Sequence, residues 1–237
     1  MAEVIVALDF DSKKKALNLV ESLGDAISLY KVGLELFSRE GLGVVEELAQ
    51  RGKRVFLDLK YHDIPNTVKS AARAAIEAGV FMYNLHALGG FSLMKEVAEF
   101  NAEYSAKVGL KERPIVLAVT LLTSLDEREI YQLGISSPLE AEVLRLAELA
   151  KRAGLDGVVC SPKEVPLIKR HLGEDFITVT PGIRPAWAER NDQKRATTPA
   201  EALRLGSDFM VVGRPITASP QPKEAALKIL KELSEEN

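Results

Sequence analysis

Three charged residues lie within six positions of one another, directly after an apolar run. Residues 55–57 are apolar, and Asp58, Lys60 and Asp63 follow them. Side chains of a β-strand alternate between its two faces, so Asp58 and Lys60 share one face while the neighbouring leucines share the other. Charges inside a protein are costly unless they are paired. The pattern therefore predicts either a buried ion-pair network or a lysine that is tuned to donate a proton.

The elements that would position these residues are short strands that alternate with helices along the chain. Apolar residues at spacings of three and four, such as Leu17, Val20 and Leu23, indicate the helices. Eight β-rich runs indicate the strands, at 4–8, 28–32, 54–59, 81–85, 115–120, 157–160, 177–180 and 209–212. Eight strand–helix units in 237 residues average about 30 residues each, which is the size of a βα unit in a parallel sheet.

We expect an α/β fold in which residues 1–237 form one domain, a (β/α)8 TIM barrel of eight parallel strands. The alternative is an open, doubly wound sheet, because strand–helix alternation alone fits both folds. The count of eight strands favours closure, and so does the lack of a Gly-x-Gly-x-x-Gly run after the first strand.

Composition limits the classes of partner. The chain has 31 Lys and Arg against 34 Asp and Glu, a formal charge of −3 with both signs interspersed. We therefore expect a small-molecule partner, and neither nucleic acid nor an anionic membrane. No apolar stretch approaches the roughly 20 residues that span a bilayer, so a cytoplasmic location is expected. The single cysteine, Cys160, lies in an apolar run, which predicts a buried structural thiol and excludes an internal disulfide.

Polar residues recur where the predicted strands end. In an eightfold barrel the active site lies at the carboxyl ends of the strands. Seven of the predicted ends have polar residues at or close to them: Asp9, Lys31, Asp58 with Lys60, His86, Thr120 with Thr123, Arg184 and Arg214. We expect these side chains to converge on one mouth of the barrel.

Each of these residues also has a purely structural interpretation. Asp9 could help to start the first helix, and Lys31 could be a strand-end lysine that extends into water. We expect His86 to be a hydrogen-bonded structural residue and His62 to be a surface loop residue, neither of them a catalyst. The charged set around Lys60 could be a structural network. The convergence of several charged groups favours a catalytic site.

A second signal follows the eighth predicted strand. Gly213 and Arg214 occupy the position at which such barrels often bind phosphate. Glycine lets backbone N–H groups approach an oxygen closely, and arginine adds a bidentate cation. We therefore expect a phosphorylated ligand, although an ordinary turn with a surface arginine would have the same sequence. The long polar segment 182–197 is expected to form a lid.

Taken together, these motifs resemble the orotidine 5′-phosphate decarboxylase family over essentially the whole chain. The most specific segment is 58–67, Asp-Leu-Lys-Tyr-His-Asp-Ile-Pro-Asn-Thr. The supporting segments are Ala7-Leu8-Asp9, Lys31-Val32-Gly33, Leu121-Leu122-Thr123-Ser124, Thr180-Pro181-Gly182-Ile183-Arg184-Pro185, Asp192-Gln193-Lys194-Arg195 and Val212-Gly213-Arg214-Pro215-Ile216. Seven segments in order argue against chance agreement.

The resemblance implies an enzyme that decarboxylates orotidine 5′-monophosphate to uridine 5′-monophosphate (UMP), the last step of pyrimidine biosynthesis. It implies no metal, no organic cofactor, and a homodimer of barrels with sites at the subunit interface. Carried over by position, Lys60 is the proton donor, in a catalytic charge array that also contains Lys31, Asp58 and Asp63. Asp63 is expected to reach this array from the neighbouring subunit, together with Thr67.

The same resemblance assigns the substrate contacts. Asp9 and Lys31 are expected to hold ribose hydroxyls, Asp58 to lie beside the reacting carboxylate, and Thr123 to meet the pyrimidine edge. The remaining binding residues, mostly on the phosphate side, are Pro181, Arg184, Gln193, Gly213 and Arg214. The run Ala-Trp-Ala-Glu-Arg at 186–190 departs from the small, glycine-containing run typical of bacterial members.

Two other functions remain open. Magnesium-dependent sugar-phosphate lyases of the same barrel group, of the keto-gulonate phosphate decarboxylase and hexulose-phosphate synthase types, also carry Asp-x-Lys-x-x-Asp. They use an acidic residue where Lys31 stands, so the lysine argues against a metal. A catalytically silent phosphate-binding barrel would account for Gly213 and Arg214 but not for an interior pair of Asp58 and Lys60.

Overall fold

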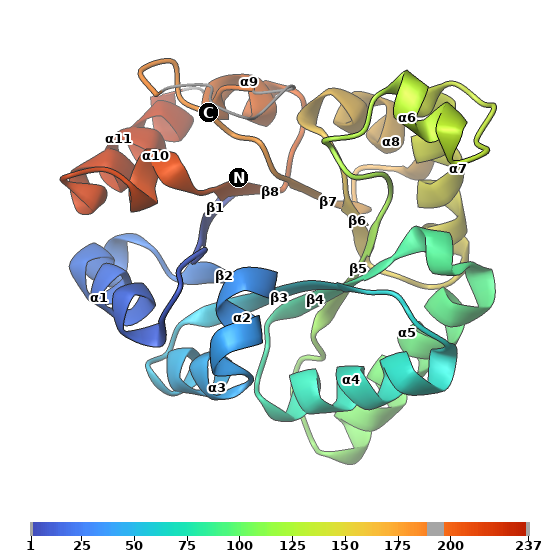
Figure 1. The fold of residues 1–237 in the computed structure, drawn as a ribbon, viewed down its shortest axis with the longest axis horizontal. Helices are drawn as coiled ribbons and strands as arrows, with labels where there is room; N and C mark the ends of the chain where they lie inside the picture. The colour runs from blue at the N-terminus through green and yellow to red at the C-terminus, as the bar shows by residue number, and fades with distance from the viewer. Residues whose placement is uncertain (1, 189–196, 236–237) are drawn as a thin grey trace.

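The computed structural model describes residues 2–188 and 197–235, and its strands form a closed barrel (Figure 1). The strands are β1 (Glu3–Ala7), β2 (Leu29–Gly33), β3 (Arg54–Tyr61), β4 (Met82–His86), β5 (Ile115–Val119), β6 (Gly157–Val159), β7 (Ile177–Thr180) and β8 (Phe209–Val212). All are parallel and follow chain order around the barrel, and β1 pairs with both β2 and β8. The predicted (β/α)8 barrel is confirmed, because the β1–β8 pairing excludes an open sheet.

Helices cover the outside of the barrel, as the view in Figure 1 shows. The α-helices of the described residues are α1 (Lys13–Leu23), α2 (Leu34–Glu40), α3 (Gly43–Gln50), α4 (Pro65–Glu77), α5 (Phe91–Lys107), α6 (Glu127–Gln132), α7 (Leu139–Arg152), α8 (Val165–Leu172), α9 (Pro199–Arg204), α10 (Arg214–Thr217) and α11 (Pro222–Glu235). Short 3₁₀ turns follow at η1 (Gly24–Ala26), η2 (Ala87–Gly89) and η3 (Pro162–Glu164). The amphipathic helices α1, α4, α7 and α11 bury one apolar stripe each against the sheet or their neighbours, as their spacing predicts.

Two apolar layers pack against the sheet. Ile5, Phe56 and Leu117 belong to a buried cluster inside the barrel, whereas Val6 and Tyr83 belong to the layer between strands and helices. Successive side chains of a strand point to opposite faces. Alternate residues of each barrel strand therefore fill the inner layer, and the residues between them fill the outer layer.

The third strand shows this alternation at the predicted charges. Leu57 is fully buried in the outer layer and Leu59 is partly buried against it. Asp58 and Lys60 instead line a cavity of the barrel mouth, which confirms the predicted sharing of a face. Two boundaries differ from expectation. Strand β3 continues to Tyr61, and Lys31 lies in the middle of β2 rather than at its end.

Two expectations from composition can be compared with the structure. Among the helices of the described residues, none is long and apolar enough to cross a membrane. Cys160 is buried, and burial raises the pKa of its thiol. A buried, protonated thiol is unreactive, in agreement with the structural role predicted for it.

Gly157 is a site where the barrel tolerates no side chain. A Cβ at this position would lie within 3.0 Å of three atoms of Ile177, one of them its backbone carbonyl oxygen. Because β6 and β7 pair at these two residues, the clash can be relieved only by moving the sheet. We expect Gly157→Ala to lower the free energy of unfolding by about 1–3 kcal/mol.

Urea unfolding followed by circular dichroism measures this loss. The matched control is Gly43→Ala in the first turn of α3, where a Cβ would meet nothing within 4 Å. The control is expected to be neutral or slightly stabilising, because alanine favours helix. Equal unfolding midpoints for the two variants would contradict the packing argument.

Candidate active site

Two lysines and two aspartates form one connected charge array at the carboxyl end of the barrel. Lys31 Nζ lies 2.9 Å from Asp9 Oδ1 and 3.5 Å from Asp58 Oδ2. Lys60 Nζ lies 2.7 Å from Asp58 Oδ1. The carboxylate of Asp58 is therefore shared between the two ammonium groups, one from β2 and one from β3. The ion pair of Asp58 with Lys60 that the sequence pattern allows is present, whereas Asp63 of the same chain does not belong to the array.

The array is graded in its exposure to solvent. The side chains of Lys31 and Asp58 are 10% and 12% exposed, that of Lys60 is 30% exposed, and that of Asp9 is 52% exposed. The structural alternatives for Lys31 and Asp9 are wrong. Lys31 does not extend into water, and the residue that caps α1 is Ser12, whereas Asp9 accepts a hydrogen bond from Lys31.

Burial and pairing act in opposite directions on these groups. Burial alone would raise the pKa of Asp58, but the charges of Lys31 and Lys60 outweigh it, and the pKa is lowered from 3.8. Burial alone would lower the pKa of Lys31, but Asp58 and Asp9 outweigh it, and the pKa is raised from 10.5. Each group is thus held in its charged form by its partners.

The signs of these shifts define a pH window. A carboxylate whose pKa is lowered in the folded state stabilises the fold at pH values above its pKa in the unfolded chain. This contribution is lost as the pH falls through its pKa in the folded state. A lysine whose pKa is raised in the folded state stabilises the fold at pH values below its pKa in the unfolded chain. This contribution is lost as the pH rises through its pKa in the folded state. The pair of Asp58 and Lys31 therefore remains ionised throughout the range between 3.8 and 10.5.

An apolar cavity of about 180 Å³ lies beside the array. Its polar wall consists of Lys31, Asp58, Lys60 and Thr123. The apolar wall is made by side chains from the interior of the barrel and the loops after β5 and β7, namely Phe56, Val119, Leu121, Leu122, Val159, Pro181 and Val211. A flat, partly apolar ring could enter this cavity with one edge against the charges.

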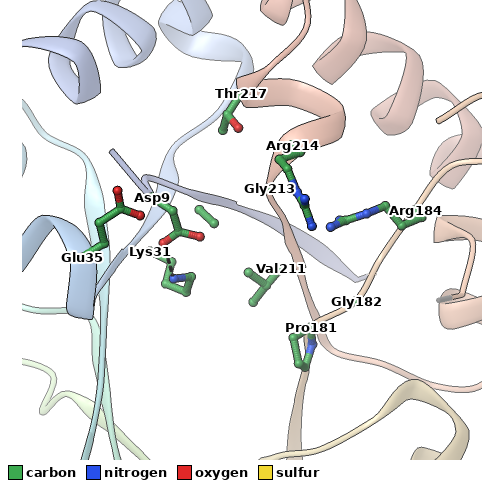
Figure 2. Close-up of a pocket in the computed structure, with 11 residues that line it drawn as sticks. Asp9, Lys31, Glu35, Pro181, Gly182, Arg184, Val211, Gly213, Arg214 and Thr217 are labelled. Atoms are coloured by element: carbon green, nitrogen blue, oxygen red, sulfur yellow. Dashed lines mark hydrogen bonds and ion pairs between the residues drawn. The ribbon is translucent and has the colours of Figure 1, made fainter. Parts of the chain in front are cut away.

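A second and wider cavity, of about 420 Å³, adjoins the first. Lys31, Pro181 and Val211 line both, so the two are parts of one mouth. Figure 2 shows Arg184 and Arg214 on one side of this cavity, with their guanidinium groups pointing toward one another, and the acidic Asp9 and Glu35 on the other.

The two arginines make this side of the cavity cationic. Arg184 is 7% exposed, and the pKa of its guanidinium is lowered, first by burial and then by the charge of Arg214. Its Nη1 donates to the carbonyl of Ile183, and its buried Nε has no hydrogen-bond partner among the described residues. Two convergent guanidinium groups beside Gly213, together with the unpaired N–H donor at Nε of Arg184, match the charge and geometry of a phosphate group.

The mouth brings together most of the residues predicted from the sequence. Those that line one or both cavities are Asp9, Lys31, Asp58, Lys60, Thr123, Pro181, Arg184, Gly213 and Arg214. Two residues do not join them. The side chains of Asp63 and Thr67 are exposed, and Asp63 accepts a hydrogen bond from the backbone N–H of Ile64. Gln193 and half of the predicted lid, residues 189–196, lie outside the described residues, so those two predictions stay untested.

The two histidines lie next to Lys60 and stack on each other. The ring centroids of His62 and His86 are 5.3 Å apart. The pKa of His86 is lowered from 6.5, first by burial and then by His62 and Lys60, so the ring is neutral at pH 7. Its Nδ1 is buried without a partner among the described residues, so the hydrogen-bonded role predicted for His86 is not seen at this atom.

Sequence reasoning missed Asn84 as a member of the site. This fully buried residue of β4 donates from Nδ2 to Asp58 Oδ1 over 2.7 Å. An amide in the middle of an otherwise apolar strand was the available signal, because a buried amide needs partners. The apolar wall of the ring cavity was also missed, since its residues have the same pattern as any barrel interior.

The closed parallel barrel and the charged mouth at its carboxyl end define a TIM-barrel enzyme. Residues 2–229 match the family model described as "Orotidine 5'-phosphate decarboxylase / HUMPS family". The chain belongs to this family, and the resemblance seen in the sequence is confirmed.

Individual relatives agree with the family. The orotidine 5′-phosphate decarboxylase of Syntrophotalea carbinolica is 51% identical over 232 residues, which cover 98% of this chain and 95% of the relative. That of Haemophilus ducreyi is 47% identical over 233 residues, covering 98% and 97%. The crystal structure of orotidine 5′-phosphate decarboxylase from Lactobacillus acidophilus is 40% identical and superposes with a TM-score of 0.87, covering 98% and 99% of the two chains.

The arginine pair predicts stabilisation by a simple anion. Inorganic phosphate at a hundred times its dissociation constant should raise the free energy of unfolding by about 2.7 kcal/mol. Arg184→Gln should remove most of this effect, because the buried guanidinium and its unpaired Nε are lost. Thermal unfolding as a function of phosphate concentration measures the response.

The matched control is Arg170→Gln, which changes an exposed arginine in the last turn of α8, at the other end of the barrel. That variant should respond to phosphate as the unmodified chain does. Indistinguishable phosphate responses in the two variants would contradict the assignment of the arginine pair.

Proposed function

We propose that this chain, in the cytoplasm, converts orotidine 5′-monophosphate to UMP and carbon dioxide as a step of pyrimidine biosynthesis. The observation that carries the proposal is the ammonium group of Lys60, held 2.7 Å from Asp58 at the wall of a cavity that fits a pyrimidine ring. The names of the relatives support the same reaction. No metal or organic cofactor takes part in the proposed mechanism.

The chemistry calls for a fixed cation. Cleavage of the bond between C6 and the carboxylate leaves an electron pair at C6 in the plane of the ring, where the π-system cannot delocalise it. Stabilisation must then be electrostatic, and a preorganised ammonium at the point where charge develops supplies it. Lys60 then transfers a proton from Nζ to C6, which completes UMP, and the neutral amine is protonated again by solvent.

Asp58 and Lys31 support this step in different ways. Asp58 fixes the position of Lys60 Nζ by a short ion pair. Placed beside the substrate carboxylate, it also raises the energy of the bound substrate by like-charge repulsion, a smaller contribution than that of Lys60. Lys31 keeps Asp58 ionised and lines both cavities, and its partner Asp9 lines the wider one, which is the place for ribose hydroxyls.

Binding energy from the far end of the substrate assists the reaction at the ring. The phosphate binds Arg184, Arg214 and the N–H groups near Gly213, with Gln193 as a further contact. Of these, Arg184, Gly213 and Arg214 lie on the wall of the wide cavity opposite Asp9 (Figure 2). Interactions at that distance hold the ring in place against Lys60 and so convert affinity into rate.

The two alternative functions, a magnesium-dependent lyase and a silent phosphate-binding barrel, agree less well with the charged residues of the site. A magnesium-dependent sugar-phosphate lyase needs an acidic residue at position 31. The ammonium of Lys31 instead lies between the carboxylates of Asp9 and Asp58, in the place of a cation. A silent phosphate-binding barrel would explain the arginines, but it would leave the buried array of Lys31, Asp58 and Lys60 without a use.

Replacement of Lys60 by alanine should abolish turnover of orotidine 5′-monophosphate while UMP binding stays measurable, because the alanine cannot stabilise or protonate the carbanion. Loss of the orotate absorbance, recorded with EDTA present, measures turnover. Retention of more than about a tenth of the unmodified rate, a barrier change below roughly 1.4 kcal/mol, would refute the role.

The control is Lys69→Ala, which removes an ion pair with Glu96 on the outside of the barrel and should leave turnover intact. The EDTA also separates the rival enzyme. Activity that vanishes with the chelator and returns with magnesium would favour the lyase.

We also propose that two copies of the chain form a dimer through the mouth of the barrel. Four exposed apolar side chains lie in segments that follow successive strand ends: Leu34 at 58%, Ile64 at 68%, Leu88 at 41% and Leu122 at 40% exposure. Apolar side chains gathered around a functional mouth are typical of a protein interface. A partner docked there would bring its Asp63 and Thr67 toward the site of the first chain.

Mixing two inactive variants tests this shared site. Asp63→Ala and Lys60→Ala should each be inactive alone, but a mixed dimer places both lesions in one site and leaves the other intact. Random exchange makes half of the dimers mixed, so about a quarter of the unmodified activity should return.

Mixing Asp58→Ala with Lys60→Ala provides the control. Both lesions then come from the chain that houses the site, so every site keeps one of them and no activity should return. If the Asp63→Ala mixture also stays inactive although subunit exchange is demonstrated, the shared site is wrong.

A further inference from the structure

The backbone of Lys60 has a conformation that side chains disfavour. Its φ angle is 52°, and it is the one residue other than glycine with a positive φ in the described part of the chain. The left-handed region brings Cβ close to the following carbonyl oxygen, so such a residue persists only where its surroundings hold it there. Something beyond the strand itself must therefore hold Lys60.

The pairing of β3 with β4 is interrupted at the same place. Leu57 pairs with Tyr83 and Tyr61 pairs with Leu85, so three residues of β3 face a single residue of β4. That single residue is Asn84. A bulge of this kind re-aims a side chain, and here the re-aimed side chain is that of Lys60.

Asn84 makes two hydrogen bonds that span the bulge. Its Oδ1 accepts from the backbone N–H of Lys60 over 2.8 Å, in place of the ladder partner that the bulge removes. Its Nδ2 donates to Asp58 Oδ1 over 2.7 Å, the same oxygen that receives the ammonium of Lys60. One fully buried side chain thus contacts both the backbone of Lys60 and the carboxylate that pairs with it.

We propose that Asn84 is a positioning residue for the decarboxylation. It holds the left-handed backbone of Lys60 and the orientation of Asp58, so that the ammonium points at the ring cavity before the substrate arrives. The inference rests on the proposed function, since it assigns Asn84 a part in that same reaction.

The chemistry of the site favours an amide in a single orientation. A rotated amide would place its NH₂ against the N–H of Lys60 and its oxygen against the carboxylate of Asp58, which is unfavourable at both ends. An aspartate would keep the acceptor for Lys60 but lose the donor to Asp58. An alanine would lose both and leave a buried N–H without a partner.

The competing interpretation is that Asn84 only stabilises the fold, and Asn101 provides the comparison. Asn101, on α5, is also fully buried and bonded through both ends of its amide. Its Oδ1 accepts from the hydroxyl of Tyr83 over 3.2 Å, and its Nδ2 donates to the carbonyl of Pro114 over 2.9 Å. Asn101 lines neither cavity of the mouth.

The experiment compares Asn84→Ala with Asn101→Ala, well below both unfolding temperatures. Asn84→Ala should lower kcat about 100-fold while KM and UMP affinity change less than about threefold, because positioning of the ammonium is lost and the binding contacts are kept. Asn101→Ala should unfold at a lower temperature but keep its kcat. A kcat for Asn84→Ala within threefold of the unmodified value, or an equal loss in both variants, would overturn the proposal.

Asn84→Asp provides a second readout that does not depend on the alanine variant folding. Asp58 is faced by Lys31 from β2 and Lys60 from β3, and the added carboxyl group would face it from β4. Like charges raise the pKa of such a pair, so the acid limb of the kcat profile should move to higher pH. An unmoved acid limb with normal kcat would overturn the proposal, whereas an unmodified chain without turnover would overturn the proposed function instead.

Discussion

The carboxylate of Asp58, shared by two ammonium groups, is the interaction on which the site depends. Asp58 is nearly buried, and its charge persists because Lys31 and Lys60 each approach one of its oxygens. Removal of one partner from a buried pair typically costs about 3–5 kcal/mol, because the remaining charge is left unpaired. The array is therefore stable only as a set, and this mutual dependence holds the side chain of Lys60 in place.

The barrel has to leave room for this set, and it does so at Gly33. A Cβ there would lie 2.6 Å from Lys31 Nζ and 3.3 Å from Asp9 Oδ1. Gly33 pairs with Asp58 across β2 and β3, so the space that the glycine leaves is filled by the ammonium that neutralises Asp58. The opposite wall carries the arginines. A substrate with a carboxylate at one end and a phosphate at the other meets cations at both ends.

The fold and much of the mouth could be predicted from the sequence because they depend on the regular spacing of apolar and polar residues along strands and helices. The strand alternation predicts that Asp58 and Lys60 share one face, and the barrel rule predicts that residues from several strand ends gather at one mouth. The bulge at Lys60 could not be predicted, because an extra residue in a strand leaves no periodic signal, and Asn84 was missed with it. Asp63 and Thr67 are exposed in a single chain. Their proposed place in a site came from the resemblance, since an isolated sequence carries no information on what a second copy contributes.

The two lysines of the array are not equivalent, and their difference indicates which one can act on a substrate. Lys31 Nζ is engaged by two carboxylates and is 10% exposed, so its charge is already compensated. Lys60 pairs with Asp58 alone among the described residues, and its side chain is 30% exposed at the wall of the ring cavity. An ammonium with one partner retains a field that a developing anion can use, whereas one held between two carboxylates retains little. The left-handed backbone at position 60 keeps this less compensated lysine at the cavity wall, where a regular strand would have continued the ladder with β4.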